Sequence, residues 1–553
     1  TAFNHAFTTG ELSETQKQII MSLLFKKGRR SLFKNYRPIS LSNVDYKILA
    51  FVLAKHLQKV IHKLTSPEHA AYINDRYIGQ NIRLLLDIIV YTKVKQKPGL
   101  LLFLDFEKAF DSLNWNFIHK CLQKFGFGED FCRWIKIIYN DPKAFVKING
   151  FLSETISFKR GIRQGCPLSA LIFIICTEFM ALQIKKNSEI KGIEIDTLEK
   201  TTSVKITQYA DDTCVYLKDL EEITPCIDTI KLFSLVSGLK LNLGKTEGLC
   251  IGSLANKKPN FHGIKWPTEP IRYLGIYIAN DMTLCEPLNW TSKLEKMQRL
   301  LDSWRVRRLT LQGKIIIIKS LAIPKIVYTT SFLPIPHNFV KNVNRILYNF
   351  LWSKNEKIKR TVLINGYEKG GLKMIDLETH TLALKAAWLS RIYKDCNNVW
   401  TYLGKAYIEK ATGGLIQQMN LCSKKQFPRL ETIPTFYQDV VIGYCKANIP
   451  EKVSSKCDLY SQSIWGNRQL LCQDKCLFSQ TFINSGYIYV KDVLLENGKM
   501  KNDIYENLVC KKNYFRTISM IQSALKPYKH LRFSEDYTHP DIQESNIVFE
   551  KCK

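Results

Sequence analysis

The apolar positions along the chain predict several long helices. Residues 44–64 and 78–96 carry apolar side chains at helical spacing, and the second segment ends just before a Pro-Gly turn signal. The longest apolar stretch, residues 170–184, contains Glu178 and is short for a segment that spans a bilayer. We therefore predict that this stretch is a helix buried inside the protein.

Continuous apolar runs between these helices predict strands. The run "LLLFLD", residues 100–105, is typical of a strand that is buried on both faces. Further strand-like segments occur at residues 145–148, 204–217, 247–251 and 271–278. Strands interleaved with helices in this way predict a mixed core, of the α+β or α/β class, over residues 99–280.

Two segments outside this core are rich in Lys and Arg. Residues 25–43, "FKKGRRSLFKNYRPISLSN", are strongly basic and loop-like, so we predict a loop. Residues 290–328 combine helical apolar spacing with many basic side chains, which predicts basic helices beyond the core. The region after about residue 353 mixes helices with loops and shows no cluster of catalytic groups.

The charge balance indicates a polyanionic partner. The chain has 80 Lys and Arg residues against 50 Asp and Glu, a net charge of +30. Nucleic acid is the commonest partner of so basic a protein, and a basic surface without a specific partner is the alternative.

The 16 cysteines are scattered singly, as in a reduced, intracellular protein. The pair Cys472 and Cys476 lacks further ligands at suitable spacing, so we expect no zinc site.

Two adjacent carboxylates lie inside an apolar run. The segment "ITQYADDTCVYL", residues 206–217, contains Asp211 and Asp212, and Asp105 ends the earlier apolar run. Paired aspartates alone are typical of a solvated turn. Together with Asp105 they indicate three converging carboxylates, which are the ligands that two divalent metal ions need for phosphoryl transfer. Mg²⁺ suits such a site because it prefers a few carboxylates together with substrate phosphates and water.

An ordered series of motifs surrounds these aspartates. The motifs are "NYRPISL" (35–41), "INDRYIGQNI" (73–82), "FLDFEKAFDSLNW" (103–115), "KRGIRQGCPLSALIF" (159–173), "QYADD" (208–212), "SGLKLNLGKTE" (237–247), "IRYLGIYI" (271–278), "LTLQGKIIIIKSLAIPKIVY" (309–328), "FLWS" (350–353) and "GGLKMIDL" (370–377). In this order the chain resembles the reverse transcriptase domain of a non-LTR (LINE-type) retrotransposon. The resemblance covers nearly the whole chain up to about residue 395.

The resemblance implies an α+β fold with the right-hand arrangement of a polymerase. We expect fingers at residues 1–98, a palm at 99–280 that includes the primer-grip hairpin "IRYLGIYI", and a helical thumb at 281–352. Residues 353–553 are then a mostly helical C-terminal extension with no assigned role. A plain β-hairpin and a solvated basic helix are the alternatives for the primer grip and for the thumb helices at 293–319.

The resemblance assigns the catalytic carboxylates. Asp105, Asp211 and Asp212 match the ligands of two Mg²⁺ ions, with Mn²⁺ as the alternative ion. Phe110 matches the aromatic residue that lies under the deoxyribose. A rigid ring there leaves no room for a ribose 2′-hydroxyl, and the alternative is an aromatic residue of the core.

The remaining site residues also follow from the resemblance. Gln164 and Gly165 line the nucleotide pocket, Arg37 grips the triphosphate, and Tyr209 takes the place of a Phe in many relatives. Lys245 lies near the triphosphate, where it protonates the pyrophosphate or holds its charge. A surface lysine is an equally good interpretation of Lys245.

We expect two further arginines, Arg76 and Arg163, to contact the template rather than to act in catalysis. The implied function is an RNA-directed DNA polymerase that extends a primer 3′-hydroxyl with dNTPs. Its partners are an RNA template and a DNA primer held as an RNA–DNA heteroduplex, without a membrane. The expected location is intracellular, in a cytoplasmic ribonucleoprotein and in the nucleus.

Two alternatives to this function are open. One is an intron-encoded reverse transcriptase with maturase activity, and the other is an inactive, polymerase-shaped RNA-binding scaffold. Intact Asp105, Asp211 and Asp212 argue against the scaffold, because a scaffold does not need metal ligands. Full-length relatives carry an upstream endonuclease that has no counterpart here, so we expect this chain to polymerise but not to nick its target.

Overall fold

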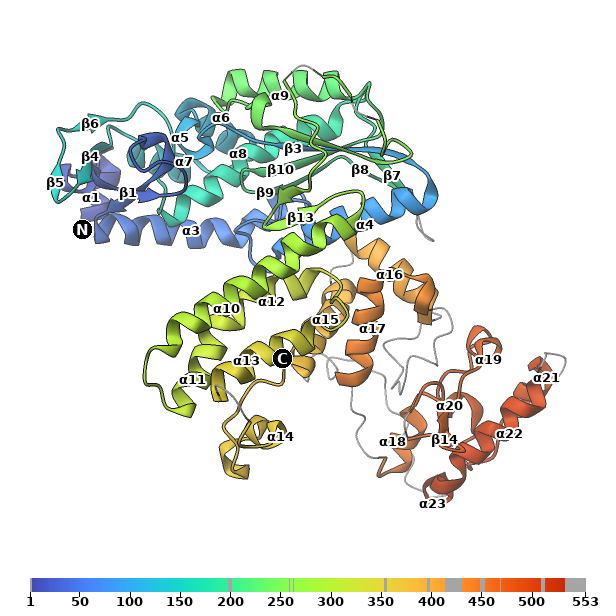
Figure 1. Ribbon diagram of the computed structural model, residues 1–553. Helices are drawn as coiled ribbons and strands as arrows, with labels where there is room; N and C mark the ends of the chain where they lie inside the picture. Colours follow the sequence, from blue (N-terminus) through green and yellow to red (C-terminus); the bar gives the residue numbers. More distant parts are fainter. Residues whose placement is uncertain are drawn as a thin grey trace. The chain divides into compact units, whose positions relative to one another are not determined.

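A computed structural model describes residues 2–532, apart from residues 197–200, 258, 262, 353–355, 395–397, 413–429, 448–452, 468 and 509–512. The chain divides into two compact units, whose elements are labelled in Figure 1. The first unit comprises Thr1–Cys285 with Asn398–Trp400, and the second comprises Glu286–Asn397 with Thr401–Lys553. The boundaries that we expect for fingers, palm and thumb stay predictions.

The first unit combines helices with short and long strands. Its helices are α1 Ala2–Thr9, α2 Glu14–Lys17, α3 Val44–Leu64, α4 Ile78–Lys95, α5 Ala109–Ser112, α6 Trp115–Lys124, α7 Glu129–Ile138, α8 Pro167–Lys186 and α9 Ile223–Ser237, with 3-10 turns η1 Phe33–Asn35, η2 Leu243–Lys245 and η3 Met282–Cys285. Its strands are β1 Gln18–Phe25, β2 Tyr36–Ser42, β3 Pro98–Leu104, β4 Lys143–Ile148, β5 Phe151–Leu152, β6 Ile156–Ser157, β7 Ile193–Asp196, β8 Thr201–Val204, β9 Ile206–Tyr209, β10 Asp212–Leu217, β11 Glu247–Gly252, β12 Ile271–Tyr273 and β13 Ile276–Ile278. The mixed class and the helices and strands predicted in the core are confirmed.

A four-stranded sheet forms the centre of this unit. Its strand order is β11-β3-β10-β9, and each neighbouring pair is antiparallel. Successive side chains of a strand point to opposite faces. Leu100, Leu102 and Leu104 of β3 therefore join the hydrophobic core on one face, whereas Phe103 points to the other, where its ring lies 5.1 Å from that of Tyr273 on β12. Strand β3 is buried on both faces, as its apolar run predicts.

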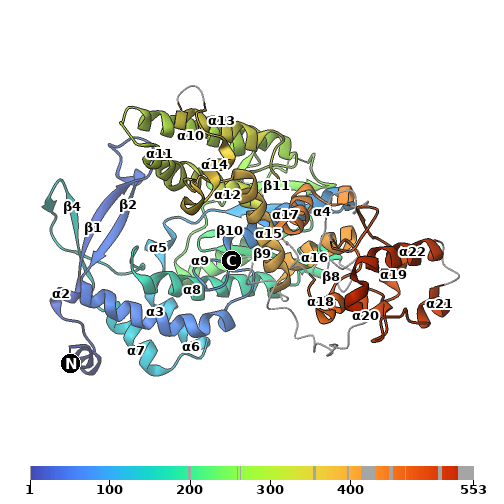
Figure 2. The same ribbon diagram turned by 90° about the horizontal axis from the view of Figure 1, so that it is seen from below.

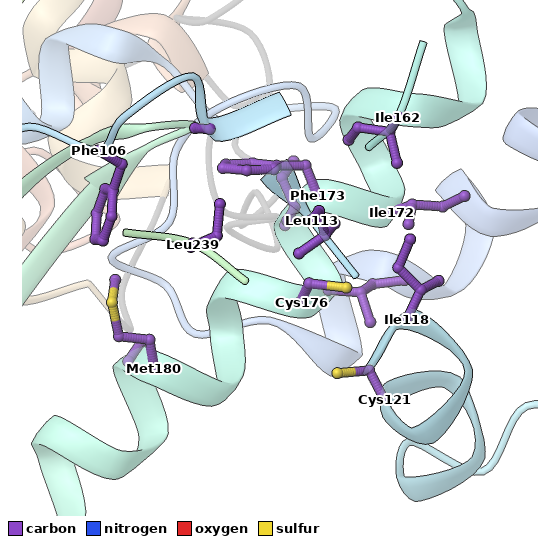
Figure 3. Close-up of a cluster of buried hydrophobic side chains, with 14 of the residues drawn as sticks. Phe106, Leu113, Ile118, Cys121, Ile162, Ile172, Phe173, Cys176, Met180 and Leu239 are labelled. Atoms are coloured by element: carbon purple, nitrogen blue, oxygen red, sulfur yellow. The ribbon is translucent and has the colours of Figure 1, made fainter. Parts of the chain in front are cut away.

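Helix α8 crosses the core beside this sheet. It begins at Pro167, where the missing N–H of proline costs nothing, and it packs against α3, α6 and α9. Figure 3 shows Phe173, Cys176 and Met180 of this helix among the buried side chains. The helix is long enough to cross a membrane, and its most apolar stretch has a mean hydropathy of 1.8. However, 72% of that stretch is buried inside the protein. The predicted buried helix at 170–184 is confirmed.

A second sheet includes a segment that we predicted wrongly. Its order is β2-β1-β4-β5, with β6 also pairing with β4, and Figure 2 shows β1, β2 and β4 beside one another. Residues 36–42 of the predicted loop form β2, in which Arg37 pairs with Leu24 of β1. Pro38 and the polar residues around it obscure the strand pattern. Proline is tolerated because β2 is an edge strand and Pro38 need not donate to a further neighbour.

The second unit is mostly helical in its described part. Its elements are the π-helical turns η4 Pro287–Thr291 and η5 Ile318–Ala322, helices α10 Ser292–Arg305, α11 Leu311–Ile317, α12 Pro324–Phe332, α13 Phe339–Trp352, α14 Arg360–Ile364, α15 Leu377–Lys394, most of α16 Val399–Thr412, α17 Thr435–Ala447, α18 Lys456–Ser461, α19 Gln480–Asn484, α20 Val490–Val493, α21 Asp503–Leu508, α22 Tyr514–Leu525 and α23 Lys529–Arg532, turns η6 Tyr367–Lys369, η9 Leu430–Thr432 and η10 Lys526–Tyr528, and strands β14 Leu471–Cys472 and β15 Lys475–Cys476.

The basic helices predicted at 290–328 are confirmed. Residues 311–332 bend by 45° between η5 and α12, because Pro324 cannot donate the backbone hydrogen bond that continues a helix. Helix α15 packs against α17, and the indole of Trp388 donates to the Ser331 carbonyl at 2.8 Å. Ser353, which ends the motif "FLWS", lies outside the described residues.

Candidate active site

The paired aspartates lie at the turn of the hairpin formed by β9 and β10. Tyr209 pairs with Asp212 across the hairpin, so Ala210 and Asp211 form a two-residue turn. Ala210 has a φ of 58°, a left-handed conformation that costs a non-glycine residue about 1 kcal/mol. The tight turn exposes the side chains of Asp211 and Asp212 at the end of the sheet.

Asp105 lies beside this turn because of the strand register. Thr213 of β10 pairs with Leu104 of β3 in an antiparallel ladder. Continuing this register by one residue places Asp105, which directly follows β3, opposite Asp212, the first residue of β10, at a typical Cβ separation of about 5 Å. The structure thus brings the three predicted carboxylates together where the two inner strands, β3 and β10, meet at one end of the sheet.

The segment 242–246 holds the backbone of Asp105. The Asn242 N–H donates to the Asp105 carbonyl at 2.8 Å, and the Asp105 N–H donates to Thr246 Oγ1 at 3.5 Å. On the turn between them, Lys245 Nζ lies 3.7 Å from Asp105 Oδ2. The lysine side chain is 67% exposed, so this ion pair is weak and the ammonium remains available to an anionic ligand.

The electrostatics of the turn centre on Asp212. Loss of hydration raises the pKa of Asp212 to about 6, although part of the side chain still reaches solvent. The neighbouring charges of Asp211 and Asp105 add to this rise in pKa, because three carboxylates repel one another at close range. Lys26 and Arg37 oppose the rise, which places the loop after β1 and the strand β2 within electrostatic reach of the carboxylates.

Tyr209, which we expect among the substrate-binding residues, lies beside the paired aspartates. Tyr209 ends β9 and is half-buried, and burial raises the pKa of its hydroxyl, with smaller contributions from Tyr72 and Asp212. The hydroxyl therefore stays protonated over the physiological range and can donate a hydrogen bond. Its neighbour across the hairpin is Asp212 itself.

The donor set of the turn fits a hard divalent cation. Carboxylate oxygens are the ligands that Mg²⁺ prefers, and a cation there neutralises the repulsion that raises the pKa of Asp212. Within the part of the chain that the structure describes, no group of three or more His, Cys, Asp or Glu side chains is arranged to hold a metal ion by itself. A Mg²⁺ ion bound by these carboxylates would need water and substrate phosphate to complete its coordination shell, as is common for Mg²⁺.

Phe110 lies on α5, five residues after Asp105. Its ring stacks on Phe173 of α8 with centroids 4.7 Å apart and an interplanar angle of 9°. Its carbonyl accepts a hydrogen bond from the Ile162 N–H at 2.7 Å. The stacked core ring and the backbone contact hold Phe110 rigidly, and rigidity is what a steric gate needs.

Gln164 and Gly165 link α5 to the strand β2. The Ser40 N–H of β2 donates to the Gln164 carbonyl at 2.8 Å, and Gln164 Nε2 donates to Asp111 Oδ1 at 3.3 Å. Gly165 has a φ of 105°, and a Cβ there lies 3.2 Å from the Ser40 carbonyl. Only glycine combines this φ with so close an approach of two backbones.

A cavity of about 210 Å³ lies behind this link. Asp111 and Gln164 contribute polar groups to its wall. Much of the rest of the wall is apolar, from Trp115, Tyr139 and Phe158. The cavity is therefore a mostly apolar space, with the amide–carboxylate pair, Arg160 and Arg163 also at its wall.

Two predicted template contacts have structural roles. Arg163 is 6% exposed, donates to the Ile138 carbonyl at 3.1 Å and lies 4.0 Å from the Tyr46 ring centroid. Its burial contradicts the prediction that it contacts a template. Arg76 donates to a carbonyl in the last turn of α3 and to carbonyls of the loop that follows, including that of Ser66, so it holds this loop against the helix.

The sequence reasoning missed two residues of this site. Lys26 follows β1, which pairs with β2. Its positive charge opposes the rise in the pKa of Asp212. Asp111 belongs to the same motif as Asp105 and Phe110, so the sequence could place it near the site. Its partner Gln164 lies 53 residues further along the chain, so the hydrogen bond between them could not be predicted. No local pattern reveals either contact.

Comparison with protein families agrees with this geometry. The family described as "Reverse transcriptase (RNA-dependent DNA polymerase)" matches residues 25–278, which include the three carboxylates, Phe110 and Gln164. Residues 25–278 are a reverse transcriptase domain. The domain contains β2, so the segment that we predicted as a loop is part of it.

Curated proteins similar to this chain are proteins of transposons and retrotransposable elements. The "Transposon TX1 uncharacterized 149 kDa protein" of Xenopus laevis is 28% identical over 79% of this chain and 34% of its own length. The Pol polyprotein of retrotransposable element R2 from Popillia japonica is 23% identical over 56% of this chain and 43% of its own length. The Pol polyprotein of element R2DM from Drosophila melanogaster is 21% identical over 57% of this chain. The chain thus spans between 30% and 43% of the length of these relatives.

Solved structures with partial similarity are telomerases. Telomerase from Candida tropicalis in complex with the TWJ fragment of telomeric RNA is 12% identical, with a TM-score of 0.39 over 73% of this chain and 67% of that chain. Apo telomerase from the same species is 12% identical, with a TM-score of 0.40 over 71% of this chain and 70% of that chain.

Proposed function

We propose that this chain is the RNA-directed DNA polymerase of a non-LTR retrotransposon, which extends a primer 3′-hydroxyl with dNTPs on an RNA template. The observation that carries the proposal is the register of β3 and β10. It places Asp105 opposite Asp212 and beside Asp211, within a reverse transcriptase domain. Similarity to retrotransposon proteins supports the biological context.

Asp105, Asp211 and Asp212 are the proposed ligands of two Mg²⁺ ions, with Mn²⁺ as the alternative ion. Bound there, such ions supply Lewis acidity and stabilise the negative charge that develops in phosphoryl transfer. The protein contributes the oxygen ligands and holds them on adjacent strands. Lys245, on the turn that binds the Asp105 backbone, can hold the charge of the pyrophosphate or carry a proton to it at Nζ.

Other residues of the unit are proposed to bind and select the nucleotide. Arg37 and Lys26 lie within electrostatic reach of Asp212, where cations attract a triphosphate. Phe110, held by Phe173, excludes a ribose 2′-hydroxyl. Gln164 and Gly165 bring their segment against β2, beside the strand that carries Arg37.

The right-hand arrangement is proposed for the whole chain, with fingers at 1–98, palm at 99–280 and thumb at 281–352. Helix α10 in the thumb carries exposed Lys296, Arg299 and Arg305, which suit contacts to the phosphates of a heteroduplex. The β12–β13 hairpin is the proposed primer grip. Action in a cytoplasmic ribonucleoprotein and in the nucleus follows from the proposed function.

Primer extension tests this function. We expect the purified chain, with Mg²⁺, an RNA template and an annealed DNA primer, to extend the primer with dNTPs. Asp211→Asn should abolish extension and leave RNA binding nearly unchanged, because it removes a metal ligand without altering the fold. Asp130→Asn, an exposed change of equal charge on α7, is the matched control and should retain activity. Full extension by Asp211→Asn contradicts the assignment of the carboxylates.

A further inference from the structure

Asp111 forms a contact in this site that the proposed chemistry does not use. Its carboxylate accepts a hydrogen bond from Gln164 Nε2, and the two side chains line the same cavity. We propose that Asp111 is a positioning residue that fixes which end of the Gln164 amide faces the nucleotide. The inference rests on the proposed polymerase function and extends it to a residue outside the metal and triphosphate contacts.

The backbone around this pair is anchored without Asp111's carboxylate. Between the two segments, the Gly161 N–H donates to the Leu113 carbonyl and the Ile162 N–H to the Phe110 carbonyl, both at 2.7 Å. The Trp115 indole donates to the Gly161 carbonyl, also at 2.7 Å. Changing the Asp111 side chain therefore leaves these anchors in place and affects chiefly the orientation of the Gln164 amide.

An ionised carboxylate determines that orientation. A glutamine amide has two donors on Nε2 and one acceptor, Oε1, whereas a carboxylate can only accept. Asp111 can therefore pair only with Nε2, and Oε1 must point elsewhere. At 3.3 Å this hydrogen bond is long, so the orientation is selected by the acceptor-only chemistry of the carboxylate rather than by the strength of the bond.

The cavity explains why a positioning residue is needed. About 210 Å³ of mostly apolar space lies next to the amide, so Gln164 has room to rotate away from the nucleotide. The Asp111 hydrogen bond keeps it at the wall. An asparagine at position 111 has nearly the same shape, but it can pair with either end of the Gln164 amide and so no longer selects one orientation.

The charge on Asp111 depends on its surroundings. Burial raises the pKa of Asp111, and the hydrogen bond from Gln164 and the charge of Lys108 partly offset this rise. The other titratable or charged groups on the elements that face it are Arg160, Arg163 and Tyr139, all at the cavity wall. When pH falls through this raised pKa, Asp111 becomes a donor and the selection of Nε2 is lost.

Nucleotide kinetics test the inference in the full chain. For single-nucleotide addition, Asp111→Asn and Asp111→Ala should raise KM for dNTP about tenfold with kcat within about twofold, the loss of one charged hydrogen bond. Both changes should have almost no further effect in a Gln164→Ala background. If Asp111→Ala raises KM for dNTP by the same factor in the wild-type and Gln164→Ala backgrounds, the positioning role is overturned.

The pH profile gives a second reading of the same experiment. In the wild-type chain KM should rise as the pH falls through the pKa of Asp111, and Asp111→Asn should lack this contribution and keep only the part of the acid limb that comes from Asp212. The Asp130→Asn control should keep the acid limb. An acid limb in KM that persists unchanged in Asp111→Asn overturns the inference.

A measurement without catalysis separates this inference from the proposed function. In the full chain labelled with ¹⁵N-glutamine, the side-chain NH₂ signal of Gln164, assigned by its loss in Gln164→Ala, should shift with pH. In Asp111→Asn that titration should vanish. If the wild-type chain extends no primer, the proposed function fails while this titration still decides whether Asp111 holds Gln164. A Gln164 signal that does not respond to pH overturns the inference.

Discussion

Asp105, directly after β3, lies opposite Asp212 at the start of the neighbouring antiparallel strand β10, with Asp211 at the adjoining turn. Lost hydration raises the pKa of Asp212 to about 6, and the neighbouring charges of Asp211 and Asp105 add to the rise. The side chains that make the site fit a cation also destabilise it when the cation is absent. The protein therefore holds unfavourable electrostatic energy at the point where the proposed metal ions bind.

Replacing Asp212 should stabilise the metal-free protein at neutral pH. The folded pKa lies above the unfolded value of about 3.9, so stability from this group is complete below about pH 4 and is lost as the pH rises through 6. Because the side chain is partly exposed, we expect Asp212→Asn to raise the free energy of unfolding at pH 7.5 by only about 1 kcal/mol. Urea unfolding in EDTA measures the difference.

The difference between the two proteins should itself depend on pH. Near pH 3.5 Asp212 is protonated in both the folded and the unfolded state, so wild type and Asp212→Asn should be equally stable. Asp130→Asn, which changes an exposed charge away from the turn, should show no such pH dependence. A wild-type protein that is the more stable of the pair at pH 7.5 contradicts the electrostatic account.

Mg²⁺ should stabilise the protein in a pH-dependent way. Binding requires deprotonated carboxylates and so competes with the proton that Asp212 holds below pH 6. We expect the rise in melting temperature caused by millimolar Mg²⁺ to grow as the pH increases from 5 to 7.5 and to disappear in Asp212→Asn. Differential scanning fluorimetry checks both. If Mg²⁺ raises the melting temperature of Asp212→Asn as much as that of the wild type, the ion binds at another site.

Phe110→Val should raise the use of ribonucleotides. The smaller side chain leaves space where the Phe110 ring lies against Phe173, so a 2′-hydroxyl is no longer excluded. We expect the ratio of rNTP to dNTP incorporation to increase by at least about tenfold, a discrimination of roughly 1.4 kcal/mol. Phe117→Val, in the same core but outside the site, should leave this ratio unchanged. An unaltered ratio in Phe110→Val removes the gate role.

Local signals in the sequence were sufficient for the carboxylates and the central strands. Asp105 ends an apolar run and Asp211 interrupts another, so the strands and the polar ends could be recognised together. The strand β2 was missed because Pro38 and the basic residues around it hide the alternation of an edge strand. Its presence could be inferred only from its pairing with β1.

Long-range contacts explain the remaining differences. Arg163 was expected to contact the template, but the fold buries it against Tyr46. Folding brings Lys26 within electrostatic reach of Asp212, and it brings Asp111 within hydrogen-bond distance of Gln164. None of these contacts has a signature in neighbouring residues, since each joins segments that are far apart in the chain.

Gly161→Ala should cost more stability than Gly126→Ala and should damage the site. Both glycines have a positive φ, of 91° and 77°, so both substitutions incur backbone strain of about 1 kcal/mol. At Gly161 the new Cβ also lies 2.7 Å from the Asp111 carbonyl, whereas at Gly126 nothing lies within 4 Å. We expect the free energy of unfolding to fall by about 2 to 4 kcal/mol for Gly161→Ala, measured in urea.

The Gly161→Ala change also tests how closely α5 and the Gln164 segment are coupled. The added methyl group must push the backbone of Asp111 away, and the Ile162 N–H bond to Phe110 moves with it. Discrimination against rNTPs and affinity for dNTP should therefore both fall in Gly161→Ala and be unchanged in Gly126→Ala. If Gly161→Ala loses stability but keeps both nucleotide properties, the close approach of the two segments serves folding rather than the nucleotide site.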